Sequence, residues 1–256
     1  MAKLLVVCCD GTWDRPDELG DGTPTPTNVT KIALALADKD NQQLEQRMFY
    51  HLGVGALGIP MTPSALAAFI NRRTRFHDTD LSSQVGAAFQ ALAIDEKRGP
   101  FFPTLWTHVT EGQRVEQVWF TGVHRDVGGG YPQHQLSDIT FRWMMDRARE
   151  CGLAFVDGSD TALRVSTNPV PGDDVLTAAL QVDPNPLAAP HNSLTFYYRL
   201  LPRYRRTLGI VDRIHEFAAS TAVQRLAAHP EDPSPGLDAY LKGRGQIKDV
   251  DADITS

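Results

Sequence analysis

The sequence lacks the cysteine motifs and the long apolar runs that mark disulfide-rich, membrane-spanning or secreted proteins. It holds only three cysteines, none in C-x-x-C spacing, so the chain has no disulfide framework. We expect these thiols to be small buried apolar residues in a reducing compartment. No apolar run approaches the roughly 20 residues that a membrane-spanning helix needs, and the run at residues 4–9 is too short for a secretory leader. We therefore expect a cytoplasmic protein, exported only by a route that needs no cleaved leader.

The chain also lacks an excess of positive charge. Its 256 residues include 25 Lys and Arg against 31 Asp and Glu, which gives a formal net charge of −6. An acidic chain of this kind is a poor candidate for binding the phosphate backbone of a nucleic acid. The hydrophobic share of 42% is that of an ordinary globular protein, and the length favours one large domain. We expect a single domain over residues 1–256, with a flexible tail over residues 230–256.

Short apolar segments alternate along the chain with segments of helical periodicity. This alternation predicts an α/β fold with a parallel sheet flanked by helices. Thr27 or Asn28 is expected to cap the first helix, and Ser137 or Asp138 is expected to cap the helix after the glycine-rich stretch. The expected strands cover residues 4–9, 47–52 and 115–121, and the expected helices cover residues 29–38, 64–71, 81–94, 137–151 and 212–228.

Two of the expected strands end in residues that can carry chemistry. In parallel sheets, ligands bind beyond the carboxyl ends of the strands. His124 follows the third expected strand, where an imidazole would act as a general base or only hydrogen-bond to a loop. Asp126 would orient His124 or stiffen the turn. The turn Asp10-Gly11-Thr12 would supply N–H donors to an oxyanion hole or form an Asx-turn that redirects the chain.

The sequence contains no nucleophile motif and no metal motif. None of its serines lies in G-x-S-x-G, the strand-to-helix turn that exposes a nucleophilic serine, and Cys8 and Cys9 lie inside the first strand. No H-x-x-x-H or H-E-x-x-H spacing marks a metal centre. We expect no cofactor; a calcium ion near Asp10 is left open, with nothing in the sequence to support it. The acidic pair Asp95-Glu96 is interpreted as the solvated, salt-bridged end of a helix.

Taken together, these motifs resemble those of a known family, in the family's order and over nearly the whole chain. The chain resembles the α/β-hydrolase domain of the type VI secretion lipase effectors, family 1, long catalogued as a domain of unknown function. The longest shared motif is G-V-H-R-D-V-G-G-G-Y at residues 122–131. The others are C-D-G-T-W at residues 9–13, T-N-V at 27–29, F-H-D-T at 76–79, A-L-A-I-D-E at 91–96, V-W-F at 118–120, L-S-D-I at 136–139, R-W-M at 142–144 and I-H-E at 214–216.

The resemblance implies a serine esterase that acts on lipids, with phospholipids as the substrates of the toxin members. It also implies secretion machinery or an immunity protein as a partner. The family uses a Ser–Asp–His triad, whose histidine carries over to His124, and an oxyanion site near Gly11 and Thr12. In the family, the nucleophile lies in a G-F-S-R-G-A segment and the acid in a G-V-W-D-T-V-G-A-L-G segment. This sequence contains neither segment.

The gap in the resemblance falls at one place. Residues 50–55 resemble an early strand of the family and the G-V-G after it, and residues 56–60 resemble the segment just after the triad acid. We infer an internal deletion near residues 53–56 that removes at least one βαβ unit of roughly 30 residues. Losing a central strand unpairs the backbone of its neighbours at about 1–3 kcal/mol per buried group, so the strands at 4–9 and 115–121 would have to pair anew. The expected sheet is an incomplete α/β-hydrolase-like sheet.

Three functions stay open on this sequence. In the first, the chain is a lipid-ester hydrolase of the phospholipase type by descent, inactive because the nucleophilic serine and the triad aspartate are absent. In the second, it is a non-catalytic pseudoenzyme or binding remnant, whose ligand is lipid, an immunity protein or secretion machinery. In the third, it is a metal-assisted hydrolase that reuses His77, Asp78, His124 and Asp126, and chelation would abolish its activity.

Overall fold

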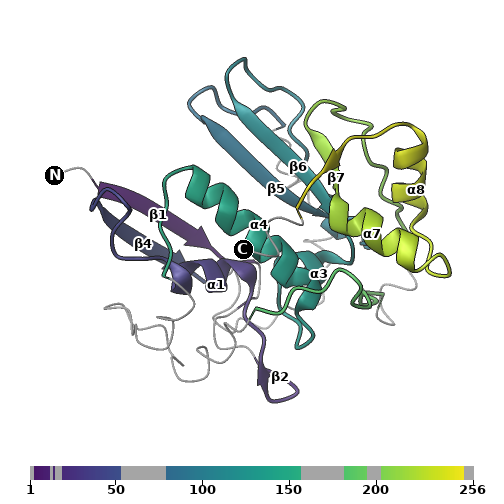
Figure 1. The fold of residues 1–256 in the computed structure, drawn as a ribbon, viewed down its shortest axis with the longest axis horizontal. Coiled ribbons are helices and arrows are strands. Elements are labelled where there is room, and N and C mark those ends of the chain that lie inside the picture. Colours follow the sequence, from purple (N-terminus) through teal and green to yellow (C-terminus); the bar gives the residue numbers. More distant parts are fainter. Residues whose placement is uncertain are drawn as a thin grey trace, which may run out of the picture. The chain divides into compact units, whose positions relative to one another are not determined.

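The computed structural model describes residues 3–11, 14, 19–52, 79–156, 182–194 and 203–250 (Figure 1). Thr12, the expected helix at residues 64–71, and the pair His77-Asp78 lie outside these residues. The chain divides into two compact units, the first holding residues 1–58, 128–188 and 253–256 and the second holding residues 59–127 and 189–252. Among the described residues, no helix is long and apolar enough to cross a membrane.

The first unit is built on two parallel strands. β1 (Lys3–Cys9) pairs in parallel with β4 (Glu45–His51) along the whole length of both. The hairpin of β2 (Leu19–Gly20) and β3 (Thr23–Pro24) comes between them in the chain. The strands predicted at residues 4–9 and 47–52 are therefore confirmed, and they pair with each other.

One face of this two-stranded sheet is exposed. Leu5, Val7 and Phe49 are 74%, 58% and 59% exposed, whereas Cys8, on the opposite face of β1, is buried. Parallel sheets normally have both faces covered, whereas no described helix or strand covers this apolar face. Cys9 lies on the exposed side; the expectation of buried thiols is confirmed for Cys8 and wrong for the other two cysteines.

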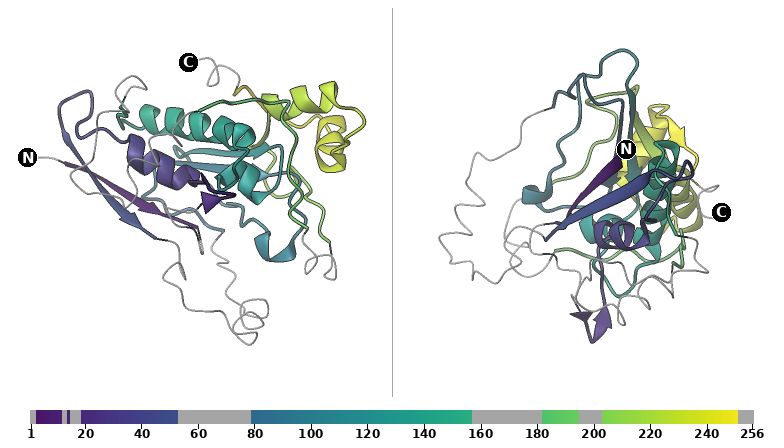
Figure 2. Two further views of the ribbon diagram at one scale, coloured as in Figure 1. Left: turned by 90° about the horizontal axis from the view of Figure 1, so that it is seen from below. Right: turned by 90° about the vertical axis from the view of Figure 1, so that its left-hand side faces the viewer.

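Two helices pack together in the first unit, α1 (Asn28–Ala35) and α4 (Gln135–Glu150) (Figure 2). Thr27 caps α1 as predicted, because its hydroxyl accepts a hydrogen bond from the Thr30 N–H at 3.1 Å. The predicted cap of α4 is wrong. The helix begins two residues earlier than expected, after His134, so that Ser137 and Asp138 lie in its first turn. The apolar contacts of α1 and α4 come from Ile32, Ala35, Phe141, Met145, Phe155 and Val182.

A buried ion pair also joins these two helices. The Lys31 ammonium of α1 lies 2.6 Å from the Asp138 carboxylate of α4, and their side chains are 2% and 0% exposed. His134 contacts the second carboxylate oxygen of Asp138, and the Asp183 N–H donates to the same oxygen at 2.9 Å. Burial would raise the pKa of Asp138, but His134 and Lys31 outweigh it and lower that pKa. Asp138 is therefore a buried, ionised residue that needs its partners.

The second unit contains a four-stranded parallel sheet in the order β5-β6-β7-β8 (Figure 1). Its strands are β5 (Ala87–Ala93), β6 (Arg114–Phe120), β7 (Glu216–Ala219) and β8 (Ile247–Lys248). The predicted strand at residues 115–121 is confirmed as β6, which is buried on both faces. The other elements of this part of the chain are the 3₁₀ turn η1 (Gly99–Phe101) and the helices α3 (His124–Gly128), α7 (Ser220–Ala228) and α8 (Pro235–Lys242).

Two predicted helices of the second unit are wrong. The helix expected at residues 81–94 is instead strand β5. Its alanines, leucine and glutamine favour helix locally, but pairing along the whole of β6 overrides that preference. The helix expected at residues 212–228 begins only at Ser220, because the four residues before it form β7 between β6 and β8. Residues 235–248, placed in the expected tail, form α8 and β8.

The described strands thus confirm an α/β fold with an incomplete parallel sheet flanked by helices. The parallel strands fall into one sheet of two and one sheet of four. β1 and β6 do not pair with each other: β1 keeps β4, and β6 keeps β5 and β7. Each of the two strands that were expected to need a partner is therefore paired, though not with the other.

Candidate active-site rim

The candidate site lies where β5 and β6 end. Because the carboxyl ends of parallel strands meet at one edge of a sheet, the residues after β5 and β6 come together there. The Asp95 N–H donates to the Gly122 carbonyl at 3.0 Å, and the Gly122 N–H donates to the Asp95 carboxylate at 2.7 Å. The interpretation of Asp95-Glu96 as the end of a helix is therefore wrong, since both residues belong to the rim of the sheet.

Glu96 is the centre of the hydrogen bonds on this rim. Its side chain is 1% exposed and forms a two-pronged ion pair with Arg98, with N···O distances of 2.8 and 2.9 Å. It also accepts hydrogen bonds from the Ser193 hydroxyl at 3.0 Å and the His124 N–H at 3.2 Å. Burial alone would raise the pKa of Glu96, but Arg98 and the His124 N–H outweigh it and lower that pKa to about 2. Glu96 is therefore a fixed negative charge that anchors the backbone of His124.

His124 begins α3 and keeps its imidazole at the surface. The ring packs at a tilt of 54° on Phe101, with 4.9 Å between the ring centroids. Although the residue is exposed, the protein around the ring removes part of its water, and this desolvation lowers the pKa of His124. Nearby arginines lower this pKa further, and Glu96 opposes them. The imidazole is therefore neutral at pH 7, which is the state that a general base needs.

Asp126 is buried and orients a histidine, but that histidine is His191. Its carboxylate accepts from the Val123 N–H at 2.9 Å, the His191 N–H at 3.0 Å and the His191 ring Nδ1 at 2.6 Å. In the described part of the chain, Asp126 forms no hydrogen bond to His124. Gly122 allows this turn: its φ is +104°, and an added Cβ would lie 2.4 Å from the Cβ of Asp126. Asp126 both stiffens the turn and fixes His191.

The turn after β1 is held by the Asp10 carboxylate. One carboxylate oxygen accepts from the Gly11 N–H at 2.9 Å and the Thr27 hydroxyl at 2.7 Å. The other accepts from the Thr30 hydroxyl at 2.9 Å and from the Tyr50 hydroxyl. These four donors tie the end of β1 to α1 and β4. The Gly11 N–H is directed at Asp10, which is the geometry of a turn that fixes the chain.

The described residues do not assemble a nucleophile with a base. No described serine hydroxyl is hydrogen-bonded to a histidine ring: Ser193 donates to Glu96, and Ser234 donates to Asp95 at 3.3 Å. The described residues also contain no group of three or more His, Cys, Asp or Glu side chains placed to hold a metal ion. His124 and Asp126, two of the four residues expected in a metal-assisted hydrolase, point to different partners.

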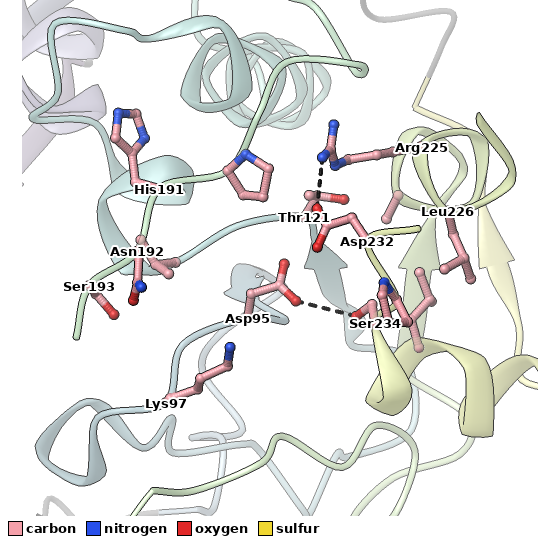
Figure 3. A pocket seen from close by; sticks show the side chains of 15 residues that line it. Asp95, Lys97, Thr121, His191, Asn192, Ser193, Arg225, Leu226, Asp232 and Ser234 are labelled. Atoms are coloured by element: carbon pink, nitrogen blue, oxygen red, sulfur yellow. Dashed lines mark hydrogen bonds and ion pairs between the residues drawn. The ribbon is translucent and has the colours of Figure 1, made fainter. Parts of the chain in front are cut away.

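A pocket of about 230 Å³ opens beside this rim within the second unit (Figure 3). Asp95 and Lys97 from the segment after β5, and Thr121 from the end of β6, line one part of it. Arg225 from α7 and Ser234 from the connection between α7 and α8 line another. In Figure 3, the Asp95 carboxylate lies near the middle of the pocket.

Sequence reasoning misses three residues of this region. The position of Asp95 and Lys97 just after an apolar segment is a usable signal. The sequence hides it because the composition of β5 favours a helix. His191 had none: it follows Asp126 by 65 residues, in an irregular stretch rich in proline and aspartate. Only the fold brings its ring to the Asp126 carboxylate.

A comparison with protein families finds a match. The family model described as "T6SS, Phospholipase effector Tle1-like, catalytic domain" matches residues 3–59 and 53–147. The two matched segments overlap at residues 53–59 and together span more than half of the chain. No curated protein matches the chain, and no solved structure matches it.

Proposed function

Since this chain belongs to the Tle1-like phospholipase effectors of the type VI secretion system, we propose that it descends from a lipid-ester hydrolase but does not itself hydrolyse lipid esters. The family match supports the descent. The inactivity follows from chemistry, because an acyl-transfer site of the serine type needs a nucleophile, a base and an orienting acid together. The chain keeps the motif histidine, His124, and lacks the motifs that carry the other two.

The observation that carries this proposal is the form of the family match. The match is made of two segments that meet and overlap at residues 53–59, which is where the sequence passes from an early family strand to the segment after the triad acid. A chain with the whole catalytic block would be expected to match in one continuous segment. An internal deletion at residues 53–56 accounts for both the overlap and the absent G-x-S-x-G turn.

The sheet supports the same proposal. A βαβ block contributes strands to the sheet and helices that cover its faces. The described parallel strands form two sheets, and the β1/β4 sheet exposes Leu5, Val7 and Phe49 on one face. Loss of a covering layer explains why such an apolar face is left in water.

The first test is the activity of the purified full-length chain on a short-chain fluorogenic phospholipid. We expect no hydrolysis above that of the His124→Ala variant, because loss of the nucleophilic serine lowers kcat by roughly a millionfold. An authentic phospholipase serves as the positive control, and a cooperative thermal transition shows that the chain is folded. Hydrolysis by the unmodified chain that His124→Ala abolishes would overturn the proposal.

A second test separates a natural deletion from an error in the gene record. The gene is amplified from its source and sequenced across the codons for Gly53 to Ala56. The short junction is the expected result. An intact block that encodes a G-x-S-x-G turn and a downstream aspartate would instead make the natural product a serine lipase, with His124 as its base.

The binding remnant is the second candidate function, and one observation favours it. The pocket of the second unit is lined by described residues that all lie outside the junction. Its lining therefore does not depend on the nucleophile or the acid. A chain that has lost catalysis would keep this pocket, with lipid, an immunity protein or secretion machinery as candidate partners.

A further inference from the structure

The pocket beside the rim is small and placed where α/β proteins bind ligands. Its volume of about 230 Å³ lies below the roughly 300–1,000 Å³ of sites that enclose drug-sized molecules. It opens at the carboxyl ends of β5 and β6, the edge at which parallel sheets bind their ligands. The pocket therefore fits a small polar molecule.

The pocket is lined by four Asp, Lys and Arg side chains, and two of them neutralise each other. Arg225 and Asp232 form an ion pair at 3.0 Å, drawn as a dashed line in Figure 3. This leaves Asp95 and Lys97, which have opposite charges. Within the described residues, the Lys97 ammonium has no hydrogen bond and no ion pair. The pocket thus presents one cation without a direct partner among the described residues, and one carboxylate, to the same small volume.

Within the described residues, the Asp95 carboxylate has two hydrogen-bond donors, one close and one distant. It accepts a hydrogen bond from the Gly122 N–H at 2.7 Å and a longer one from the Ser234 hydroxyl at 3.3 Å. Burial raises the pKa of Asp95, against the opposing effects of these two donors and of Lys97, while Asp232 raises it further. A cation bound beside Asp95 would relieve the cost of keeping this buried carboxylate charged.

We propose that this pocket binds a small zwitterion, with its ammonium group on Asp95 and its phosphate or carboxylate group on Lys97. A ligand with both charges leaves neither residue unpaired, whereas a simple anion would meet the Asp95 carboxylate and a simple cation would meet Lys97. The hydroxyls of Ser234 and Thr121 line the same pocket and supply neutral hydrogen-bonding groups. This inference does not depend on whether the chain hydrolyses esters, because none of these residues belongs to the triad.

The test is isothermal titration calorimetry on the full-length chain. O-phosphoethanolamine and β-alanine are the zwitterionic probes, and ethanolamine and inorganic phosphate carry one charge each. We expect at least one zwitterion to bind at one site per chain and more than tenfold more tightly than either single-charge probe. Vesicles of phosphatidylethanolamine form a separate arm: binding to vesicles identifies a lipid headgroup as the source, and binding to the soluble probes alone identifies a free metabolite.

Matched variants test the two contacts. Lys97→Met and Asp95→Asn are each expected to weaken binding at least tenfold. Lys242→Met and Asp238→Asn remove the same charges from an exposed ion pair on α8, outside the pocket, and are expected to change binding less than twofold. Because Lys97 is exposed and unpaired in the described structure, Lys97→Met leaves the fold intact, and a thermal melt of each variant confirms this.

Three results would overturn the proposal. The first is a folded chain that binds neither zwitterion at 10 mM, a concentration at which about −2.7 kcal/mol of binding free energy would give half-saturation, and does not bind the vesicles. The second is binding of inorganic phosphate as tight as that of O-phosphoethanolamine. The third is tight binding that Lys97→Met and Asp95→Asn leave unchanged.

Discussion

The two parallel sheets of this chain differ in how well they are covered. In the second unit, β6 has a partner strand on each side, and its residues Val118, Trp119 and Phe120 are at most 2% exposed. In the first unit, β4 is the one partner of β1 among the described strands, and Leu5 and Val7 are more than half exposed. The difference teaches that the two sheets are covered unequally, which is the result expected if the proposed loss of a central block removed neighbours of the first unit's sheet.

Truncating one aromatic residue in each sheet should give the largest contrast. Trp119→Ala removes a side chain that is 1% exposed and donates a hydrogen bond to Glu216 at 3.0 Å, so we expect a loss of about 3–5 kcal/mol in the free energy of unfolding. Phe49→Ala removes a side chain that is 59% exposed, and we expect a loss of less than about 0.5 kcal/mol. Urea unfolding measures both. Equal losses of unfolding free energy for the two variants would show that the face of β4 that holds Phe49 is covered.

Acid should lower the free energy of unfolding by protonating Glu96 of the second unit, and this effect should be somewhat smaller than that of Trp119→Ala. The pKa of Glu96 in the folded chain is about 2, below its ordinary value of 4.5. Ionised Glu96 therefore stabilises the folded state above about pH 4.5, and this contribution is lost as the pH falls from there through 2. The shift corresponds to on the order of 3 kcal/mol.

The matching variant is Glu96→Gln. It should lower the free energy of unfolding at pH 7 and flatten its dependence on pH between 4.5 and 2. The control is Glu111→Gln, which changes an exposed glutamate of the same unit. Urea unfolding of the two variants across this pH range measures the difference. Parallel pH profiles for the two variants would refute the assigned role of Glu96.

Polar substitutions on the exposed face of β1 should have the smallest effect on folding. Leu5→Ser and Val7→Ser change side chains that are more than half exposed, so we expect changes within about 0.5 kcal/mol. The same substitutions should reduce self-association measured by light scattering, because they remove an exposed apolar patch. A loss above 1.5 kcal/mol, measured by urea unfolding, would mean that another layer covers this face.

How much of the fold the sequence reveals depends on whether local and long-range forces agree. β1 is a largely apolar run with two valines, and β6 combines two valines with Trp119 and Phe120, so β-propensity and burial point to the same structure in both. The residues of β5 are mostly alanine, leucine and glutamine, which favour helix until β6 pairs with them. β7 has four residues and stands directly before α7, so helical periodicity conceals it.

The candidate site also contains residues that the sequence predicts and residues that it does not. His124 and Asp126 stand in one motif after a recognisable strand, so the sequence alone places them on the rim. The partner of Asp126 could not be predicted, because His191 comes from a distant irregular segment and no periodicity relates the two. The positions of Asp95 and Lys97 are predictable once β5 is recognised as a strand, because residues after the carboxyl end of a parallel strand lie where ligands bind.

The buried pair of Lys31 and Asp138 has a consequence for how relatives of this chain can vary. Its two members come from opposite sides of residues 53–56 and are separated by 107 positions in the sequence. Losing either one alone leaves a buried charge without a partner, at a cost of about 3–5 kcal/mol. Neither position can change by itself, so an alignment of homologues should show the two columns substituted together. Such covariation would show that relatives of this chain share the contact between α1 and α4.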